Sequence, residues 1–264
     1  MDIISVDNPR VKNWTKLLEK KGRDRQNKFI IEGIHLVNEA IQSDVHIEMI
    51  GYAADQGIPE EIYQEKAASY TEWIGVSREV LAKCSDTVTP QGVFAIVRKW
   101  ESRAGDLLNI DQPLVIAVDG IQDPGNLGTI IRSSDAVGAT GVVIGKGTVD
   151  VFNPKTIRAT MGSLFHLPVV EADLETLLLD VKKQSIDIVS TGLDAHEHCY
   201  AEDFTKGIWI VVGNEGQGVS ETISKHVDRQ MIIPMVGQAE SLNVAMATTV
   251  ILYEALRQRL YSVK

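Results

Sequence analysis

Three short segments in the second half of the chain combine glycines with polar side chains at spacings that suit ligand binding. The first runs from Asp119 to Arg132, contains Asn126, and follows an apolar run at 114–118. Glycines let a backbone approach a ligand closely, and the start of the following helix offers free N–H groups to an anion. The segment has neither the GxGxxG of a dinucleotide-binding fold nor the Gly-Lys-Ser/Thr of a phosphate-binding loop. Taken alone, it favours a plain helix cap at Asn126 and a solvated Arg132.

The other two segments are also ambiguous when each is taken alone. The sequence Gly-Asn-Glu-Gly-Gln-Gly at 213–218 directly follows the apolar run 208–212. Three glycines around Glu215 suit a tight loop over a flat ligand, although an ordinary strand-to-helix turn fits equally well. The third segment has Ile233 in an Ile-Ile-Pro-Met run, followed by Ser-Leu-Asn at 241–243 before a long helix. There the serine is explained equally well as a helix cap.

The elements around these segments alternate between strand and helix patterns. Apolar runs bounded by turns predict strands at 114–118, 141–144, 186–190, 208–212 and 230–233. Helical spacing of apolar residues predicts helices near 126–137, 154–163, 173–184, 219–226 and 242–260. Such an alternation predicts an α/β fold in which helices cover a mostly parallel sheet. Ligands bind these sheets beyond the carboxyl ends of the strands, where all three segments fall.

Taken together, in this order and at this spacing, the three segments resemble the SpoU/TrmH branch of the SPOUT (α/β-knot) methyltransferases. The resemblance extends over about residues 112–264. Its first motif is matched by Asn126 with Arg132, its second by Gly-Asn-Glu-Gly at 213–216, and its third by Ile-Pro-Met at 233–235 with Ser-Leu-Asn at 241–243. The resemblance implies a deep trefoil knot, bent S-adenosylmethionine as cofactor, a homodimer, and methyl transfer to a ribose 2′-hydroxyl of RNA.

The same resemblance implies a role for individual residues. By position, Gly213, Ile233 and Leu242 contact the cofactor, largely through backbone groups. The positions of the catalytic or positioning residues are taken by Asn126, Arg132, Glu215, Ser241 and Asn243.

The role of Arg132 stays open between two chemistries. A 2′-hydroxyl reacts only once its proton is removed or its alkoxide is stabilised. The family proposal makes the arginine a general base assisted by an RNA phosphate. Because the pKa of an arginine lies above about 12, we expect Arg132 instead to bind the phosphate and stabilise the developing oxyanion. Asn126, Ser241 and Asn243 then orient the ribose, while Glu215 shapes the second loop.

Positive charge gathers near the N-terminus of an otherwise acidic protein. The formal net charge is −10, yet residues 8–28 hold eight basic residues and only two acidic ones. Asn-Pro at 8–9 predicts the start of a helix that carries a basic stripe. An acidic protein has to bind RNA through such a local surface. We therefore predict RNA contacts from Lys12, Lys16, Lys20 and Arg23, with a solvated helix face as the alternative.

The first half of the chain also has alternating elements. Strands are predicted at 29–31, 45–50 and 93–97 and helices at 34–41 and 59–69, with a polar linker at 99–113. The sequences at 29–33 and 36–40 loosely resemble the ribosomal-protein-like RNA-binding domain found at the N-terminus of the family. We predict an RNA substrate-binding domain at 1–100 and a knotted methyltransferase domain at 112–264.

The composition of the chain bears on its localisation, the redox state of its cysteines and metal binding. No signal-like start and no apolar run of about 18 residues is present, which predicts a cytoplasmic protein without a membrane partner. Cys84 and Cys199 are far apart and are expected to be reduced. The sequence His-Glu-His-Cys at 196–199 consists of residue types that can bind a metal ion. These consecutive residues lack the spacing of a structural zinc site, so no metal is expected.

Three rival functions are weighed against a ribosomal RNA methyltransferase. A dehydrogenase is disfavoured because GxGxxG is missing after Val118. A catalytically inactive RNA-binding assembly factor is disfavoured by the presence of Arg132, Glu215 and Asn243. A transfer RNA 2′-O-methyltransferase is disfavoured because the separate N-terminal domain resembles those of rRNA-modifying members, an analogy at the level of fold.

Overall fold

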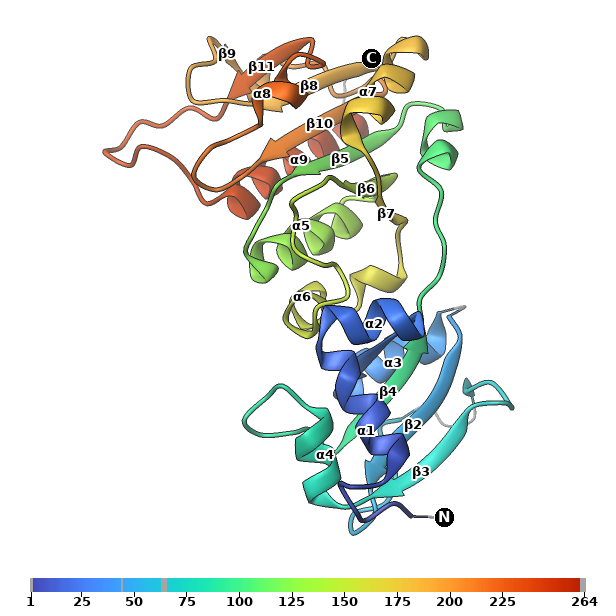
Figure 1. The fold of residues 1–264 in the computed structure, drawn as a ribbon. Helices are drawn as coiled ribbons and strands as arrows, with labels where there is room; N and C mark the ends of the chain where they lie inside the picture. Colours follow the sequence, from blue (N-terminus) through green and yellow to red (C-terminus); the bar gives the residue numbers. More distant parts are fainter. Residues whose placement is uncertain (1, 44, 63–65, 262–264) are drawn as a thin grey trace. The chain divides into compact units, whose positions relative to one another are not determined.

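The computed structural model describes residues 2–43, 45–62 and 66–261, which form two compact units (Figure 1). The first unit holds the chain up to Glu101 together with Asp150–His166, and the second holds Ser102–Val149 and the chain from Leu167 onward. The chain therefore passes from one unit to the other at three peptide bonds. This grouping differs from the predicted division at 1–100 and 112–264, because residues 150–166 fold within the first unit.

The first unit contains a four-stranded sheet of order β1-β4-β2-β3. Its β4 is antiparallel to both β1 and β2, and β3 runs parallel to β2. These strands are β1 (Lys28–Glu32), β2 (Ile47–Ala53), β3 (Glu72–Val76) and β4 (Val93–Arg98). The helices of this unit are α1 (Pro9–Thr15), α2 (Lys20–Gln26), α3 (Ile34–Gln42), α4 (Arg78–Cys84) and α6 (Pro154–Thr160).

The basic N-terminal segment forms two helices rather than one. Asn8 caps α1 as predicted, with its Oδ1 accepting from the N–H of Arg10 at 2.8 Å. The helix ends at Thr15, a 3₁₀ turn follows at Lys16–Leu18, and Glu19 is extended before α2 begins. The three predicted lysines therefore lie on three successive elements and not on one helical stripe.

Two other expectations for the first unit differ from the structure. The helix predicted at 59–69 lies partly outside the described residues, and its described part contains no α-helix. The sequence analysis also missed β3 and α4, which are only five and seven residues long.

The segment 150–166 is held in the first unit by aromatic rings and ion pairs. The ring of Phe152 lies 4.7 Å from that of Phe29 and 5.7 Å from that of Trp100, centroid to centroid. Trp100 also faces Phe165 at 6.0 Å. Aromatic rings at 4.5–7 Å each add roughly 0.5–1.5 kcal/mol beyond the area that they bury. The segment is therefore an integral part of this unit.

The second unit is built on a seven-stranded sheet of order β7-β6-β5-β10-β8-β11-β9. Every paired neighbour is parallel, which confirms the predicted mostly parallel α/β sheet. All residues of the central strands β5 and β10 are buried. The strands are β5 (Leu114–Asp119), β6 (Gly141–Ile144), β7 (Val169–Glu171), β8 (Asp187–Thr191), β9 (Glu197–His198), β10 (Ile208–Gly213) and β11 (Arg229–Ile232).

Helices pack against this sheet, and part of the predicted linker joins its core. Leu107 lies in a 3₁₀ helix, Ala104–Asn109, and is only 1% exposed in the core beside Val115 and Leu178. Residues 104–109 are thus not a linker. No helix in the described part of the chain is long and apolar enough to cross a membrane. The α-helices are α5 (Pro124–Ala136), α7 (Leu174–Lys183), α8 (Glu221–Ser224) and α9 (Val244–Tyr261).

Candidate active site

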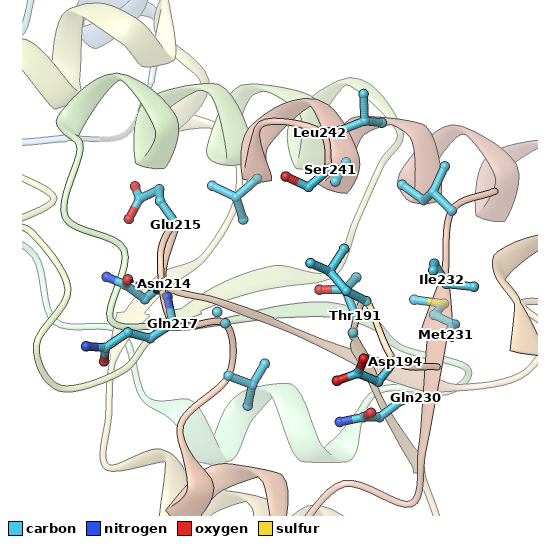
Figure 2. A pocket seen from close by; sticks show the side chains of 18 of the residues that line it. Thr191, Asp194, Asn214, Glu215, Gln217, Gln230, Met231, Ile232, Ser241 and Leu242 are labelled. Carbon is cyan, nitrogen blue, oxygen red and sulfur yellow. Dashed lines mark hydrogen bonds between the residues drawn. The ribbon is translucent and has the colours of Figure 1, made fainter. Parts of the chain in front are cut away.

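A cavity of about 440 Å³ opens at the carboxyl ends of β8, β10 and β11 (Figure 2). Three chain segments that end or follow these strands form its wall, at 191–194, 213–219 and 230–235, and the start of α9 closes it. Parallel α/β sheets bind ligands at this edge. Small-molecule sites typically enclose about 300–1,000 Å³, so the cavity has room for a nucleoside-sized ligand.

The loop after β10 is held open by its own asparagine. Asn214 and Gly218 exchange two backbone hydrogen bonds of 2.9 Å. The Oδ1 of Asn214 accepts from the N–H groups of Gly216 at 2.9 Å and Gln217 at 3.2 Å, while its Nδ2 donates to the carbonyl of Gly120 at 2.8 Å. The polar atoms of Asn214 are therefore used within the protein, and its role here is to shape the loop.

Gly213 is required where β10 enters this loop. A Cβ on Gly213 would lie 2.1 Å from the carbonyl carbon of Gly218 and 2.2 Å from the backbone nitrogen of Val219. Backbone atoms cannot move aside as the end of a flexible side chain can. The glycine thus allows two stretches of backbone to cross closely at the cavity wall.

A hydrogen-bonded network joins one residue from each of the three predicted motifs. The Nδ2 of Asn126 donates to Glu215 Oε1 at 2.9 Å, and the Nδ2 of Asn243 donates to Asn126 Oδ1 at 3.0 Å. Glu215 also accepts from the backbone N–H groups of Gln122 at 3.3 Å and Asp123 at 3.2 Å. The structure therefore brings Asn126, Glu215 and Asn243 together, as the sequence predicted.

These bonds decide the charge of Glu215. Partial burial raises the pKa of this carboxyl, but hydrogen bonds from Asn126 and from backbone N–H groups outweigh burial and hold the pKa below its ordinary value. Glu215 is therefore ionised at neutral pH. A carboxylate whose two oxygens both accept bonds from the protein is suited to fixing the loops around it, and poorly suited to taking up a proton.

The predicted cofactor residues all line the cavity, whereas Arg132 does not. Gly213, Ile233 and Leu242 form part of its wall, and so does Ser241. Arg132 lies on α5 with its side chain exposed, and within the described chain it makes no hydrogen bond or ion pair. Its guanidinium is thus available to a ligand outside the cavity.

Sequence reasoning missed the wall formed by the end of β8 and the start of β11. Thr191, Asp194 and Gln230 lie together there, at the opposite end of the cavity from Glu215 (Figure 2). In the described part of the chain these three side chains have no hydrogen-bond or ion-pair partner, so their polar groups are available to a ligand. Thr191 and Asp194 follow the strand predicted at 186–190, and that position was their only signal in the sequence. Gln230 lies within a predicted strand and had no such signal.

One of the four predicted RNA contacts is wrong. Arg23 is only 2% exposed, and its Nε and Nη2 donate to Asp150 Oδ2 at 2.9 and 2.5 Å. A buried guanidinium that is committed to a carboxylate cannot reach a phosphate. The other three, Lys12, Lys16 and Lys20, are exposed.

A parallel α/β sheet with three loops around a cavity at its carboxyl edge defines a small-molecule-binding α/β protein. Sequence profiles narrow this class. The profile of the SpoU rRNA Methylase family matches residues 113–253, and that of the MRM3-like substrate binding domain matches residues 8–95. The chain belongs to the SpoU rRNA methylase family.

Individual relatives support the same family. The chain is 36% identical over 251 residues to the 23S rRNA (guanosine(2553)-2′-O)-methyltransferase RlmP of Bacillus subtilis, covering 95% of this chain and 97% of that protein. It is similar to the crystal structure of the SpoU methyltransferase AviRb from Streptomyces viridochromogenes in complex with AdoMet, with a TM-score of 0.88, 30% identity and coverage of 96% and 99%. The A. aeolicus TrmH/SpoU tRNA modifying enzyme matches less of this chain, 61% of it against 82% of that chain, with a TM-score of 0.51 and 33% identity.

The geometry at Gly213 makes a first testable prediction. We expect Gly213→Ala to weaken S-adenosylmethionine binding by at least about tenfold, because a new Cβ forces the two crossing backbones apart and deforms the cavity wall. Isothermal titration measures the change. Gly237→Ala is the matched control, since a Cβ there meets nothing within 4 Å. Equal affinities of both variants and the wild type would show that the crossing does not shape the cofactor site.

Proposed function

We propose that this protein is an S-adenosylmethionine-dependent RNA 2′-O-ribose methyltransferase that acts on ribosomal RNA in the cytoplasm. The observation that carries the proposal is the joining of three sequence motifs at one cavity. Gly213, Ile233 and Leu242 line it, and the Asn126–Glu215–Asn243 network ties its loops together. Family membership supports the same reaction.

The cavity suits the proposed cofactor in chemistry as well as in size. Glycine backbone at 213–218 lines one end of the cavity and gives a ligand close access to the main chain. At the other end the apolar side chain of Ile232 lies beside the free polar groups of Thr191, Asp194 and Gln230, a mixture that suits a nucleoside. S-adenosylmethionine, when bound, supplies the electrophilic methyl group.

The protein's own groups then orient and activate the ribose hydroxyl. Asn126 uses one N–H and one lone pair inside the network, which leaves a second donor and a second acceptor for a ribose. The exposed guanidinium of Arg132 provides a planar fork that suits an RNA phosphate, and its charge stabilises the developing alkoxide. The ionised Glu215 holds the loops and stays out of proton transfer.

Two observations favour ribosomal RNA over transfer RNA. The relative RlmP, which covers nearly the whole of this chain, is named for 23S rRNA, whereas the TrmH/SpoU tRNA modifying enzyme covers only 61% of it. Mass-spectrometric mapping of 2′-O-methyl sites in RNA from a deletion strain tests the proposal. We expect one rRNA methyl group to disappear and to return on complementation. A missing tRNA methyl group would support the alternative substrate, and an unchanged map with no cofactor binding would support an inactive assembly factor.

The proposed substrate needs a local basic surface in this acidic protein. Lys16 and Lys20 flank the buried Leu17, and Lys12 forms only an exposed ion pair with Asp7. We expect the triple variant Lys12→Glu, Lys16→Glu and Lys20→Glu to bind RNA more weakly and with a flatter dependence on salt. The slope of the logarithm of the binding constant against the logarithm of the salt concentration should fall by up to about 0.7–0.9 per phosphate contact removed.

Filter binding at several salt concentrations measures that slope. The control replaces three exposed lysines of the second unit by glutamate, Lys182, Lys183 and Lys225. It makes the same change in net charge and should leave the slope nearly unchanged. S-adenosylmethionine affinity should not move in either variant. If both variants reduced the slope equally, the net charge of the protein would govern RNA binding, and not a basic surface at 12–20.

We also propose that the second unit contains the trefoil knot of its family. The support is indirect: two of the three segments that wall the cavity, 213–219 and 230–235, contain residues that the resemblance to this knotted family assigns to the cofactor. A knot of this kind is rare, since chains seldom thread their own loops.

The dimer proposal rests on large apolar side chains that remain exposed on and beside α9. Ala245, Thr248 and Leu252 are buried, and Thr249 is hydrogen bonded to Ser133 of α5 at 2.7 Å, so the face of α9 that carries these residues belongs to the core of the second unit. Large apolar side chains on and beside α9 remain exposed elsewhere, namely Leu242, Met246, Tyr253, Leu260 and Tyr261. Surfaces of this kind mark interaction sites, and a two-fold dimer is the commonest way to cover them.

We expect Met246→Glu with Tyr253→Glu to convert a dimer into a monomer, because two charges per subunit would be buried in a symmetric contact. Light scattering at micromolar concentration reads the mass directly. Val236→Glu is the control, since this side chain is fully exposed and lies on the connection between β11 and α9, outside the helix. A wild type that is monomeric and fully active would refute the dimer.

A further inference from the structure

A pair of stacked aromatic rings lies at one end of the sheet in the first unit. His46 directly precedes β2, and Tyr70 comes two residues before β3. Their rings are nearly parallel, at 11°, with centroids 4.6 Å apart. Tyr70 is 56% exposed, and in the described part of the chain its hydroxyl has no hydrogen-bond partner. The ring face of Tyr70 that points away from His46 is therefore open to a ligand.

Hydrogen bonds next to both rings hold this stacked pair in place. The N–H of Thr71 donates to the carbonyl of Ala68 at 2.9 Å and closes the turn that contains Tyr70. The buried hydroxyl of Thr71 donates to the carbonyl of Ile47 at 3.2 Å, which ties the residue after Tyr70 to the residue after His46. The pair is thus organised before a ligand arrives, and a ligand that stacks on it loses little affinity to ordering of the protein.

An arginine with a free side chain lies beside the stacked pair. The backbone N–H of Arg98, the last residue of β4, donates to the carbonyl of His46 at 3.0 Å. The Arg98 side chain is exposed and has no hydrogen-bond or ion-pair partner in the described chain. Two carboxylates of the described chain lie two positions from the rings, and each is paired with a base, in the ion pairs Lys28–Glu48 and Arg10–Glu72. The planar guanidinium of Arg98 therefore stays available to a phosphate.

We propose that the His46–Tyr70 pair is a stacking surface for an unpaired base of the RNA substrate, and that Arg98 binds a phosphate beside that base. This inference rests on the proposed function and names the feature of the RNA that the first unit recognises. Unpaired bases are bound by stacking on aromatic rings, which accept any base because every base has a flat π-face. The profile of the MRM3-like substrate binding domain covers residues 8–95, which include both rings.

The surroundings of Tyr70 favour RNA over a protein partner. Surfaces that bind proteins are broad apolar patches, whereas Tyr70 is an exposed ring with the charged residues Glu72 and Arg98 nearby. The Arg10–Glu72 ion pair also brings the start of α1 to the start of β3, close to Tyr70. The basic segment that we propose to bind RNA therefore begins next to the stacked pair.

Two hairpin RNAs with the same stem test the stacking surface, because they differ only in the bases of the loop. One hairpin has a loop of adenosines, and the other has as many abasic nucleotides in their place. We expect Tyr70→Leu to weaken binding of the adenosine hairpin by about tenfold, a loss typical of one stacked base. Binding of the abasic hairpin should stay unchanged, because it has phosphates but no base to stack. Fluorescence anisotropy with the full-length chain measures both dissociation constants.

Three further variants complete the test. Tyr70→Phe keeps the ring and should bind both hairpins like the wild type. Tyr200→Leu removes a tyrosine of the second unit that is also 56% exposed, and it should change neither affinity. Arg98→Ala should reduce the slope of the logarithm of the binding constant against the logarithm of the salt concentration by about 0.7. Tyr70→Leu should leave that slope unchanged, because it removes no charge.

An unchanged affinity of Tyr70→Leu for the adenosine hairpin would overturn the inference. So would an equal loss for both hairpins, since the abasic loop offers nothing to stack, and so would a wild type that binds both hairpins equally tightly. Each of these results leaves the proposed function standing if the deletion strain lacks one rRNA methyl group. An unchanged map of rRNA methyl groups would refute the proposed function by itself, whatever the hairpins show.

Discussion

Arg132→Ala should lower kcat by roughly 10²–10³-fold while the affinity for S-adenosylmethionine stays nearly constant. A loss of this size is typical when one donor to a developing oxyanion is removed. The side chain lies outside the cavity and has no partner in the described chain, so its removal should disturb neither the cofactor nor the fold. Single-turnover methylation with radiolabelled cofactor measures the rate, and isothermal titration measures the affinity.

Two further variants sharpen this result. Arg132→Lys keeps the charge and loses the planar fork, so a rate between those of the wild type and Arg132→Ala indicates phosphate binding or oxyanion stabilisation. Arg103→Ala removes another exposed arginine of the second unit and should leave the rate unchanged. Weaker cofactor binding with an unaffected rate in Arg132→Ala would remove this residue from the reaction.

Arg23→Ala should destabilise the first unit by about 3–5 kcal/mol, because it leaves the carboxylate of Asp150 buried without its partner. The carbonyl groups of Leu17 and Leu18 lose a donor at the same time. Denaturant unfolding followed by tryptophan fluorescence reports mainly on this unit, since three of the four tryptophans, Trp14, Trp73 and Trp100, lie in it.

Arg78→Ala is the matched control for Arg23→Ala. Arg78 also pairs with an aspartate, Asp55, at 2.7 Å, but both side chains are largely exposed. Exposed ion pairs contribute less than about 1 kcal/mol, so this variant should unfold close to the wild type. If both variants lost the same stability, burial would not be the reason that Arg23 matters.

The parallel sheet could be predicted because its central strands are buried on both faces. Continuous apolar runs at 114–118 and 208–212 have no other explanation in a chain of this composition, and the strands formed there as expected. The short edge strands β7 and β9 escaped prediction because two or three residues carry no periodic signal. Helix ends were less well predicted, as at α8, which is only four residues long.

The candidate site could be predicted only through the resemblance to a family. Asn126 and Glu215 lie 89 positions apart, and no local pattern says that their side chains meet. The prediction that Arg23 contacts RNA was wrong for the same physical reason. A basic residue in a basic segment is expected at the surface, and its partner Asp150 lies 127 positions away in a different part of the sequence. Local composition measures charge, whereas burial depends on contacts across the whole chain.

The return of residues 150–166 to the first unit limits how this chain can be divided. Cutting after residue 100 would give a fragment in which Phe29 and Trp100 keep each other but lose the rings of Phe152 and Phe165, and in which the charge of Arg23 has no counter-ion. Such a fragment should aggregate or stay unfolded. In evolutionary terms, residues 1–101 cannot be exchanged between relatives as an independent domain. A functional chimera has to take residues 150–166 from the same parent as residues 1–101, although β5, α5 and β6 of the second unit separate them in the gene.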